Sequence, residues 1–243
     1  MSHEQDFTEA AYRTLVRAAR DRYPFLSFAD AATAEAGVLW RHDIDVSVHR
    51  ALALATIERE EGVRSTYFVH LHSRFYNALE DAIVERLRAI VELGHEAGLH
   101  FDPNFTPAMG ADPIGAVAAE ARMVERLCGV PVRVVSFHDP GAHGAVINDA
   151  DQVGGLVNTY GRTIQQRFGY GSDSNGYWRH APLLDEVTSG RHVRLQVLTH
   201  PEWWVPEPMS PRARIARAVD GRAAYQAAKY DAALAAVGRE NLR

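Results

Sequence analysis

Short apolar runs alternate with helical patterns between residues 38 and 137, and this alternation constrains the fold more than any other feature. Buried-type, β-branched and aromatic runs predict strands at 38–40, 65–69, 96–100 and 132–137. Apolar residues at helical spacing predict helices at 48–61, 80–93 and 113–128. Strands that alternate with helices build βα units, so we predict an α/β fold with a parallel sheet or barrel.

The second half of the sequence is less regular. Residues 193–198 alternate as a strand does, and the Ala-rich segment 212–237 predicts a long C-terminal helix. Arginines recur along this segment at helical spacing, which predicts a solvated helix face; they are Arg212, Arg214, Arg217 and Arg222. No internal repeat or linker divides the chain, so we expect a single domain over residues 1–243.

Composition excludes several classes of function. The net charge is −5 and no run of Lys or Arg stands out, which argues against a nucleic-acid partner. Cys128 is the only cysteine, so no internal disulfide can form. No stretch of about 18 apolar residues predicts a membrane span. The polar N-terminus lacks the pattern of an export signal, so we expect a cytoplasmic protein, with homo-oligomers left open by the sequence.

Polar residues follow five of the predicted strands. The carboxyl ends of parallel strands face a common crevice, so we expect these side chains to share one site. Imidazoles and carboxylates without thiolates suit a divalent metal, with zinc expected and cobalt, manganese or iron as alternatives. In chain order these residues are Asp43 and Asp45, His70 and His72, His100 and Asp102, His138, and His200.

Asp43 and Asp45 form a distinctive pair. Residues two apart in an extended segment point to the same side, so the two carboxylates are expected to lie close together. Two neighbouring carboxylates repel unless a cation lies between them or one is protonated. A divalent metal would give the pair separate roles, one as a ligand and one as a base. The alternative interpretation is a pair of turn or helix-capping aspartates.

Three segments resemble the polysaccharide deacetylase family (carbohydrate esterase family 4). Residues 39–45, Leu-Trp-Arg-His-Asp-Ile-Asp, resemble its first motif in the Asp-x-Asp form. Residues 94–100, Gly-His-Glu-Ala-Gly-Leu-His, resemble the second motif, which ends in a metal-binding histidine. Residues 198–200, Leu-Thr-His, resemble the last motif. The motifs come in the family's order and span about residues 38–204.

This resemblance implies a distorted (β/α) barrel of about seven parallel strands. It implies a metal-dependent hydrolase that removes an N-acyl group, usually N-acetyl, from an amino sugar or sugar conjugate. Carried over by position, Asp43 would be the base, His200 the general acid, and Asp45 and His100 metal ligands. The expected substrate is a small N-acylated sugar or a glycan.

The sequence also departs from the family's pattern. The family has a further histidine four residues after the one at position 100, where this chain has Asn104. The third metal ligand is therefore open. We choose His138 because it follows a neighbouring strand, with Asp102, His72 and His95 as alternatives. The missing ligand also leaves two rival functions: a metal-independent amidohydrolase acting on a nonsugar amide, and a catalytically silent glycan-binding barrel.

The polar and aromatic cluster at residues 171–179 predicts contacts with a substrate. Trp178 could stack on a sugar ring, while Asp173 or Arg179 could hydrogen-bond hydroxyl groups. Trp203, just beyond the last motif, and Asp102 are further candidates for substrate binding. The alternative interpretation of the cluster is an ordinary Gly/Ser/Asn turn with a partly buried tryptophan. Arg41 and His42 are expected to orient the carboxylates of the first motif.

Overall fold

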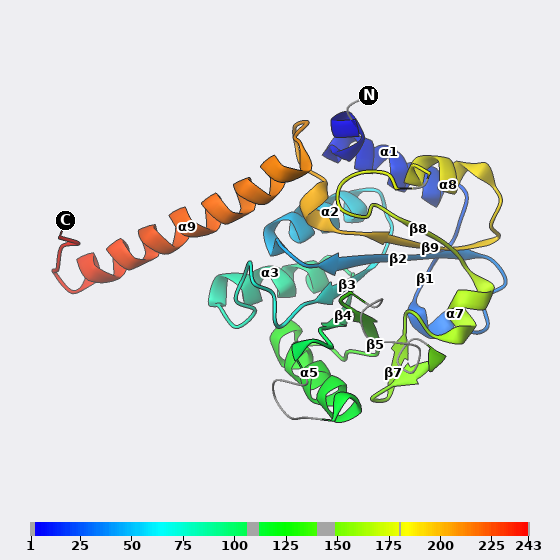
Figure 1. Ribbon diagram of the computed structural model, residues 1–243, viewed down its shortest axis with the longest axis horizontal. Helices are drawn as coiled ribbons and strands as arrows, with labels where there is room; N and C mark the ends of the chain where they lie inside the picture. Colours follow the sequence, from blue (N-terminus) through cyan, green and yellow to red (C-terminus); the bar gives the residue numbers. More distant parts are fainter. Residues whose placement is uncertain (1–2, 106–111, 140–148, 180, 243) are drawn as a thin grey trace.

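A computed structural model describes residues 3–105, 112–139, 149–179 and 181–242 (Figure 1). Within these residues nine strands form one sheet in the order β6-β7-β5-β4-β3-β2-β9-β8, with β1 paired to β2. The strands are β1 (Phe25–Leu26), β2 (Gly37–Ile44), β3 (Thr66–Val69), β4 (Glu96–Phe101), β5 (Val134–Phe137), β6 (Gln152–Val153), β7 (Leu156–Asn158), β8 (Gly169–Ser172) and β9 (Arg194–Thr199).

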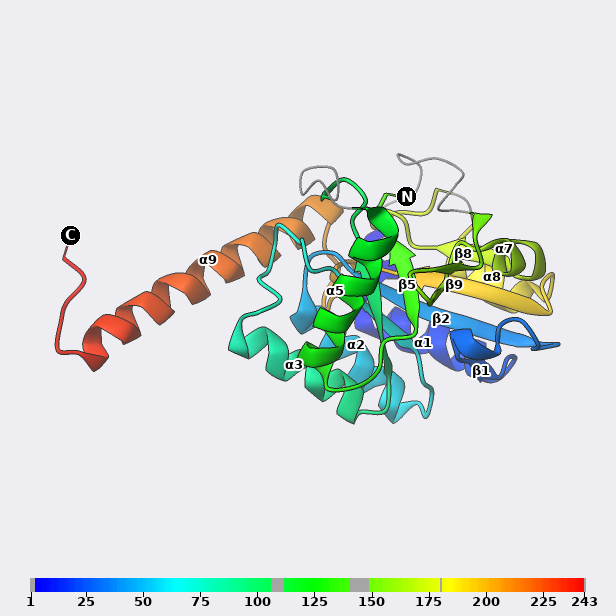
Figure 2. The same ribbon diagram turned by 90° about the horizontal axis from the view of Figure 1, so that it is seen from below.

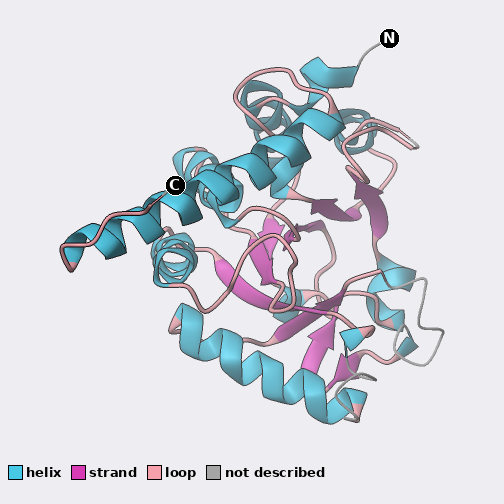
Figure 3. Cartoon of the chain, turned by 60° about the vertical axis from the view of Figure 1, so that its left-hand side comes forward, coloured by secondary structure: helices cyan, strands magenta, loops and turns pink. Residues whose placement is uncertain are grey.

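Every strand pairing is parallel except that of β6 with β7. β6 and β8 are the two ends of the sheet, so the sheet is a curled half-barrel rather than a closed ring. Figure 2 and Figure 3 show the helices arranged outside the curled strands. The predicted α/β fold with a distorted parallel barrel is confirmed.

Helices cover the outer surface of the sheet, and their apolar faces build the core. α2, α3 and α5 share one buried cluster with β2–β5, which includes Val48, Leu87 and Val117. α1 and α8 belong to a second cluster with β2 and β9, which includes Leu15 and Val187. The helices of five or more residues are η1 (His3–Phe7), α1 (Glu9–Arg20), α2 (Val48–Glu60), α3 (Asp81–Glu92), α5 (Pro113–Cys128), α7 (Arg162–Arg167), α8 (Leu183–Ser189) and α9 (Pro211–Ala236).

β2 is the strand that positions the first motif. All eight of its residues are buried, although three of them are Arg41, His42 and Asp43. Its position between β3 and β9 supplies backbone partners on both edges, as expected for a central strand of a parallel sheet. The prediction of a strand at 38–40 was too short, because charged residues conceal a buried strand when their partners lie elsewhere in the chain.

α9 projects from the body of the protein (Figures 1 and 2). Its length and position confirm the predicted C-terminal helix. Arg212 and Arg217 are exposed, as predicted for a solvated face, but Arg214 is only 2% exposed. The prediction was wrong for Arg214 because its guanidinium packs 5.0 Å from the centre of the Phe7 ring. None of the described helices is both long and apolar enough to cross a membrane.

Candidate active site

Four potential metal ligands meet at the carboxyl ends of β2, β3, β4 and β5. Asp45 follows β2, His70 follows β3, His100 lies near the end of β4 and His138 follows β5. Each of the four offers one ligand atom, and these atoms all lie within 4.8 Å of one another. They converge because these strands are parallel neighbours in the sheet, so their carboxyl ends reach the same edge.

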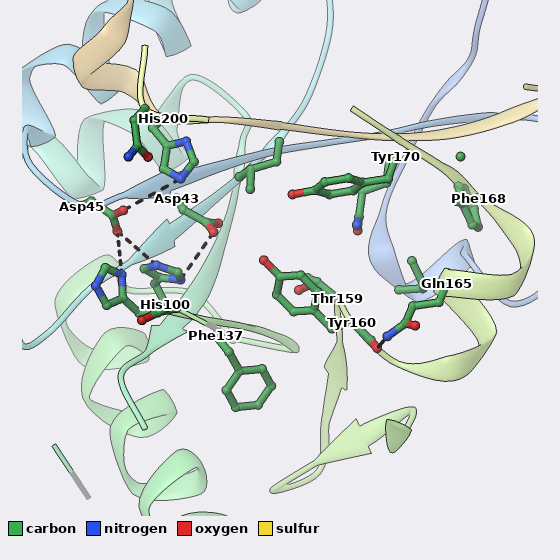
Figure 4. Close-up of a pocket in the computed structure, with 17 residues that line it drawn as sticks. Asp43, Asp45, His100, Phe137, Thr159, Tyr160, Gln165, Phe168, Tyr170 and His200 are labelled. Atoms are coloured by element: carbon green, nitrogen blue, oxygen red, sulfur yellow. Dashed lines mark hydrogen bonds and ion pairs between the residues drawn. The ribbon is translucent and has the colours of Figure 1, made fainter. Parts of the chain in front are cut away.

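Asp45 is at the centre of this group (Figure 4). Its Oδ1 lies 3.0 Å from His100 Nε2, 3.5 Å from His138 Nδ1 and 3.7 Å from His70 Nδ1. Asp45 Oδ1, His100 Nε2 and both ring nitrogens of His70 are buried without a hydrogen-bond partner. Buried polar atoms without partners are costly. The carboxylate of Asp45 and the imidazoles of His70 and His100 have such atoms, and together with the imidazole of His138 they fit a divalent cation of the kind the sequence predicted.

The protonation states of two members also suit metal binding. Burial lowers the pKa of His70, which favours the neutral imidazole. Burial opposes the charge of Asp45, but the nearby His100 outweighs this and holds the pKa of Asp45 well below its usual range. Metals bind carboxylates and neutral imidazoles, so both residues are in the form that a ligand requires.

Asp43 lies beside the group and is held by direct contacts. Arg41 Nη2 donates to Asp43 Oδ2 at 3.0 Å, and Ser136 Oγ donates to Asp43 Oδ1 at 3.2 Å. The same arginine nitrogen donates to Tyr160 Oη at 2.6 Å. Asp43 is only 2% exposed. The prediction that Arg41 orients a carboxylate of the first motif agrees with this contact.

Ser136 also fixes the tautomer of His100. Its single hydroxyl proton is directed to Asp43, so its oxygen accepts a hydrogen bond from His100 Nδ1–H at 2.6 Å. An imidazole that binds a metal through Nε2 must be without a proton on that nitrogen, and one that donates from Nδ1 then has its lone pair on Nε2. That lone pair is directed toward Asp45, as expected for a metal ligand oriented by a hydrogen bond on its other nitrogen.

His200 faces the group from β9 and is oriented by Asp173. Asp173 Oδ1 lies 2.7 Å from His200 Nδ1, while Asp173 Oδ2 accepts from the His200 backbone and from Trp204 Nε1. Burial opposes the charge of His200, but the Asp173 carboxylate outweighs burial and raises the pKa of His200 to about 10. His200 Nε2 lies 3.9 Å from Asp45 Oδ2. Nε2 of the protonated His200 imidazole is therefore directed toward Asp45 and the other potential metal ligands.

A cavity of about 710 Å³ extends from these residues between β7 and β8 (Figure 4). Two buried polar atoms in its wall, Thr159 Oγ1 and Gln196 Oε1, have no hydrogen-bond partner. Its aromatic wall is formed by Tyr160, Phe168 and Tyr170. The cavity therefore combines an aromatic surface with unpaired polar atoms, and Asp43, Asp45, His100, His138 and His200 line one end of it.

The predicted substrate contacts lie elsewhere. Trp178 stacks on Phe7 with ring centres 4.4 Å apart, and Arg179 donates to Tyr177 Oη at 3.1 Å. Trp203 is buried in the core, and Asp102 Oδ2 lies 3.9 Å from His70 Nε2. Asp173 is fully buried behind His200. None of the five is among the described residues that line the cavity, so their contact with a substrate stays a prediction.

The structure also separates the alternatives for the third ligand. His72 Nε2 pairs with Glu120 at 3.0 Å, and His95 is bonded to Ser65 and to the backbone of Ala55. Asn104 is exposed. Sequence reasoning did not assign a ligand role to His70, although its position directly after β3 matches that of Asp45 after β2. Ser136 was also missed, because nothing in the sequence indicates that a serine within β5 bridges two other strands.

The fold and site together define an α/β half-barrel with a candidate metal-binding and acid–base centre at the carboxyl ends of its strands. No family model and no curated protein matches the sequence. Matching solved structures include a polysaccharide deacetylase from Bacillus cereus (12% identity, TM-score 0.43), covering 79% of this chain and 89% of that one. A family 4 acetyl xylan esterase from Clostridium thermocellum, in complex with cobalt, matches at 15% identity and TM-score 0.39, covering 76% and 84% of the two chains.

A chitin deacetylase from Colletotrichum lindemuthianum matches at 16% identity and TM-score 0.41, with 76% of this chain and 81% of that chain covered. These matches are to the family whose motifs the sequence resembles. At these identities and TM-scores the matches are likenesses only, and the function of this protein has to be inferred from the geometry of its site.

Proposed function

We propose that this protein is a divalent-metal-dependent hydrolase that removes an N-acyl group, with acetyl expected, from an amino sugar or sugar conjugate. The observation that supports this most strongly is the convergence of Asp45, His70, His100 and His138 at one end of a cavity. A candidate base, Asp43, and a candidate acid, His200, line the same end. These are the groups that metal-assisted hydrolysis of an amide needs.

The four convergent residues would hold the metal ion. A divalent ion held there supplies Lewis acidity, which polarises an acyl group and makes water more acidic. The chain's contribution is a set of four donors, of which Asp45 and His70 are held in the form that a ligand requires and His100 is oriented through Ser136. Zinc is the expected ion, with cobalt, manganese and iron as alternatives, because the donors are nitrogen and oxygen atoms without thiolate.

Asp43 acts as the general base in this proposal. Its carboxylate accepts a proton from the attacking water. Arg41 and Ser136 occupy one position on each carboxylate oxygen and so fix its orientation. A carboxylate oxygen has more than one lone pair, so each still accepts a further proton or hydrogen bond.

His200 acts as the general acid. Because Asp173 raises the pKa of His200 to about 10, the imidazole carries a proton near neutral pH. Its Nδ1 is occupied by Asp173, so the proton on Nε2 is the one available to the leaving amine. An amine must be protonated as the C–N bond breaks, and a positioned acid typically accelerates such a step by about 10²–10⁴-fold.

The cavity favours a small substrate. Its volume of about 710 Å³ is in the range of small-molecule sites. Tyr160 and Tyr170 offer aromatic surface to a sugar ring, and Thr159 Oγ1 and Gln196 Oε1 offer unpaired polar atoms to hydroxyl groups. This combination supports a sugar or sugar conjugate as the substrate.

The test is acetate release from a panel of N-acetylated amino sugars by metal-loaded protein. We expect Asp43→Asn and His200→Gln each to lower kcat by about 10²–10⁴-fold, with metal content retained. Asp220→Asn, which makes the same change on exposed α9, serves as the control and should have no effect. Undiminished activity after chelation would contradict the metal-dependent mechanism, and no release from any acylated sugar would contradict hydrolysis itself.

A further inference from the structure

A second cavity, of about 320 Å³, lies where α9 joins the body of the protein. We call it the α9 cavity and define it by Ser47, Val48, Arg214, Arg217, Arg222 and Tyr225, which line it. Among the described residues it shares no lining residue with the catalytic cavity. It is bounded by the start of α2 on one side and by the first half of α9 on the other.

Arg214 is the unusual residue in this wall. It is only 2% exposed, yet its Nε and Nη2 have no hydrogen-bond partner among the described residues. Its Nη1 makes one long contact, 3.4 Å, with the carbonyl oxygen of Gly176. The guanidinium also packs 5.0 Å from the centre of the Phe7 ring, but the ring leaves the Nε and Nη2 donors without an acceptor oxygen, and buried donors without an acceptor are costly. An anionic ligand in the cavity would be such an acceptor.

Further positive charge surrounds the same space. Arg217 is exposed and makes a weak contact with Met209 Sδ at 4.0 Å. Arg222, which also lines the cavity, forms an ion pair with Glu80 at 2.5 Å. Arg50, also in the wall, donates to Glu9 at 2.6 Å. Arg214 and Arg217 therefore have donors available to a ligand, while Arg50 and Arg222 are already paired.

The amino end of α2 adds a second source of attraction for an anion. Ser47 is its N-cap residue, and both Ser47 and Val48 line the cavity. The Ser47 hydroxyl accepts from the backbone N–H of Arg50, while the N–H groups before it have no partners within this 13-residue helix and carry partial positive charge. Helix amino ends of this kind bind phosphate groups.

The remaining walls define the rest of the ligand. Phe75, Tyr76, Ile83 and Tyr225 offer apolar surface. Glu202 is the only acidic residue among the described lining residues, and burial raises its pKa well above the usual range, which favours the neutral acid. An anion with an apolar portion would therefore match the cavity. A phosphate group has three acceptor oxygens, which suit donors that come from several directions.

We propose that the α9 cavity is a binding site for a small molecule that carries a phosphate group and an apolar portion. The phosphate lies against Arg214, Arg217 and the amino end of α2, and the apolar portion lies against Phe75 and Tyr225. This site is separate from the catalytic cavity and does not depend on the function proposed above.

The test uses isothermal titration calorimetry of the full chain, freed of metal by chelation, with phenyl phosphate as the probe. We expect saturable binding with one site per chain. Arg217→Gln should weaken the affinity by roughly tenfold, the size expected for one charge-assisted hydrogen bond. Arg212→Gln removes the same charge from an exposed position on the same helix that does not line the cavity, and should leave the affinity unchanged.

Two further measurements test where phenyl phosphate binds and whether its phosphate group is the part that the protein recognises. His100→Ala alters the catalytic site, so it should bind phenyl phosphate as the wild type does. Benzoate and phenol should each bind at least tenfold more weakly than phenyl phosphate. The proposal is overturned by an absence of saturable binding, by loss of binding in His100→Ala, by equal binding of benzoate, or by an unchanged affinity in Arg217→Gln.

Discussion

At the scale of single residues, Asp173 controls the protonation of His200. Its carboxylate stabilises the charged imidazole, so Asp173→Asn should lower the pKa of His200 from about 10 toward its usual value. Activity needs the protonated form in our mechanism. We therefore expect the alkaline limb of the kcat/KM profile to move to lower pH, and NMR titration of His200 should report the same shift.

Metal content and Asp185→Asn provide the controls for this experiment. Asp185 is an exposed aspartate on α8, so its substitution should leave the pH profile unchanged. Metal content should stay the same in Asp173→Asn, because Asp173 is not among the four convergent residues. An unaltered alkaline limb in Asp173→Asn would exclude His200 as the acid.

Glu58 is the second residue whose substitution should have a large effect, in this case on the stability of the fold. It is fully buried, and its carboxylate lies 2.7 Å from both His42 Nε2 and Tyr67 Oη and also accepts from Tyr12 and Ser65. Burial alone would raise the pKa of Glu58, but His42 outweighs burial and lowers it from 4.5 to about 2. The resulting stability is present above pH 4.5 and is lost as the pH falls from 4.5 toward 2.

Glu58→Gln should therefore lower the free energy of unfolding at neutral pH by about 3–5 kcal/mol, because a buried carboxylate with four hydrogen-bond partners loses bonds worth about 1.5–3 kcal/mol each. Urea unfolding at neutral and acidic pH measures this effect, and the difference from wild type should shrink as the pH falls below 4.5. Glu60→Gln, in an exposed pair with Arg13, is the matched control and should change stability little. Equal losses in the two variants would contradict the role of the buried pair.

The sequence allowed several site residues to be predicted because strand ends are recognisable. The positions at or beyond the ends of predicted strands bring Asp45, His100 and His138 together, and His70 follows the same rule although no ligand role was assigned to it. The contact of Asp173 with His200 could not be predicted, since nothing in the sequence indicates that a loop residue packs behind a histidine 27 positions later. Contacts between segments that are far apart in the chain depend on the order and pairing of the strands, which the periodicity of the sequence does not specify.

At the scale of secondary-structure elements, long and strongly patterned segments were predictable. The predicted helices at 48–61, 80–93 and 113–128 correspond to α2, α3 and α5 within one residue at each end. β6, β7 and β8 have only two to four residues, and β8 contains two glycines, so they give no alternating pattern. Such strands exist because neighbouring strands pair with them, and that information is not local in the sequence.

The outer half of α9 also permits a prediction at this scale. From residue 226 to 242 every described side chain is exposed except that of Leu234, which is intermediate. Exposed residues contribute little to burial, so a chain that stops after Gln226 should keep the thermal midpoint of the full chain. A truncation before Arg214 should lower the midpoint, because it removes a buried guanidinium that packs on Phe7. Differential scanning calorimetry compares the two.

At the scale of the whole molecule, metal binding should couple to stability. A ligand that binds only the folded state stabilises it, by about 2.7 kcal/mol at a free concentration 100 times its Kd. We therefore expect zinc to raise the thermal midpoint of the chelated protein and expect renewed chelation to reverse the change. His100→Ala should abolish most of this increase, because it removes one of the convergent donors. An equal increase in wild type and variant would place the ion elsewhere.

The order of strands in the sheet has a consequence for how the protein can be altered. The four convergent residues all come from one side of the sheet, β2 to β5, whereas His200 and Asp173 follow β9 and β8 on the opposite side of β2. In our proposal the metal ligands and the general acid thus belong to different segments of the chain, which lie on either side of β2. If the proposed mechanism holds, substitutions of the residues that follow β8 and β9 should stop turnover in a protein that still binds its metal.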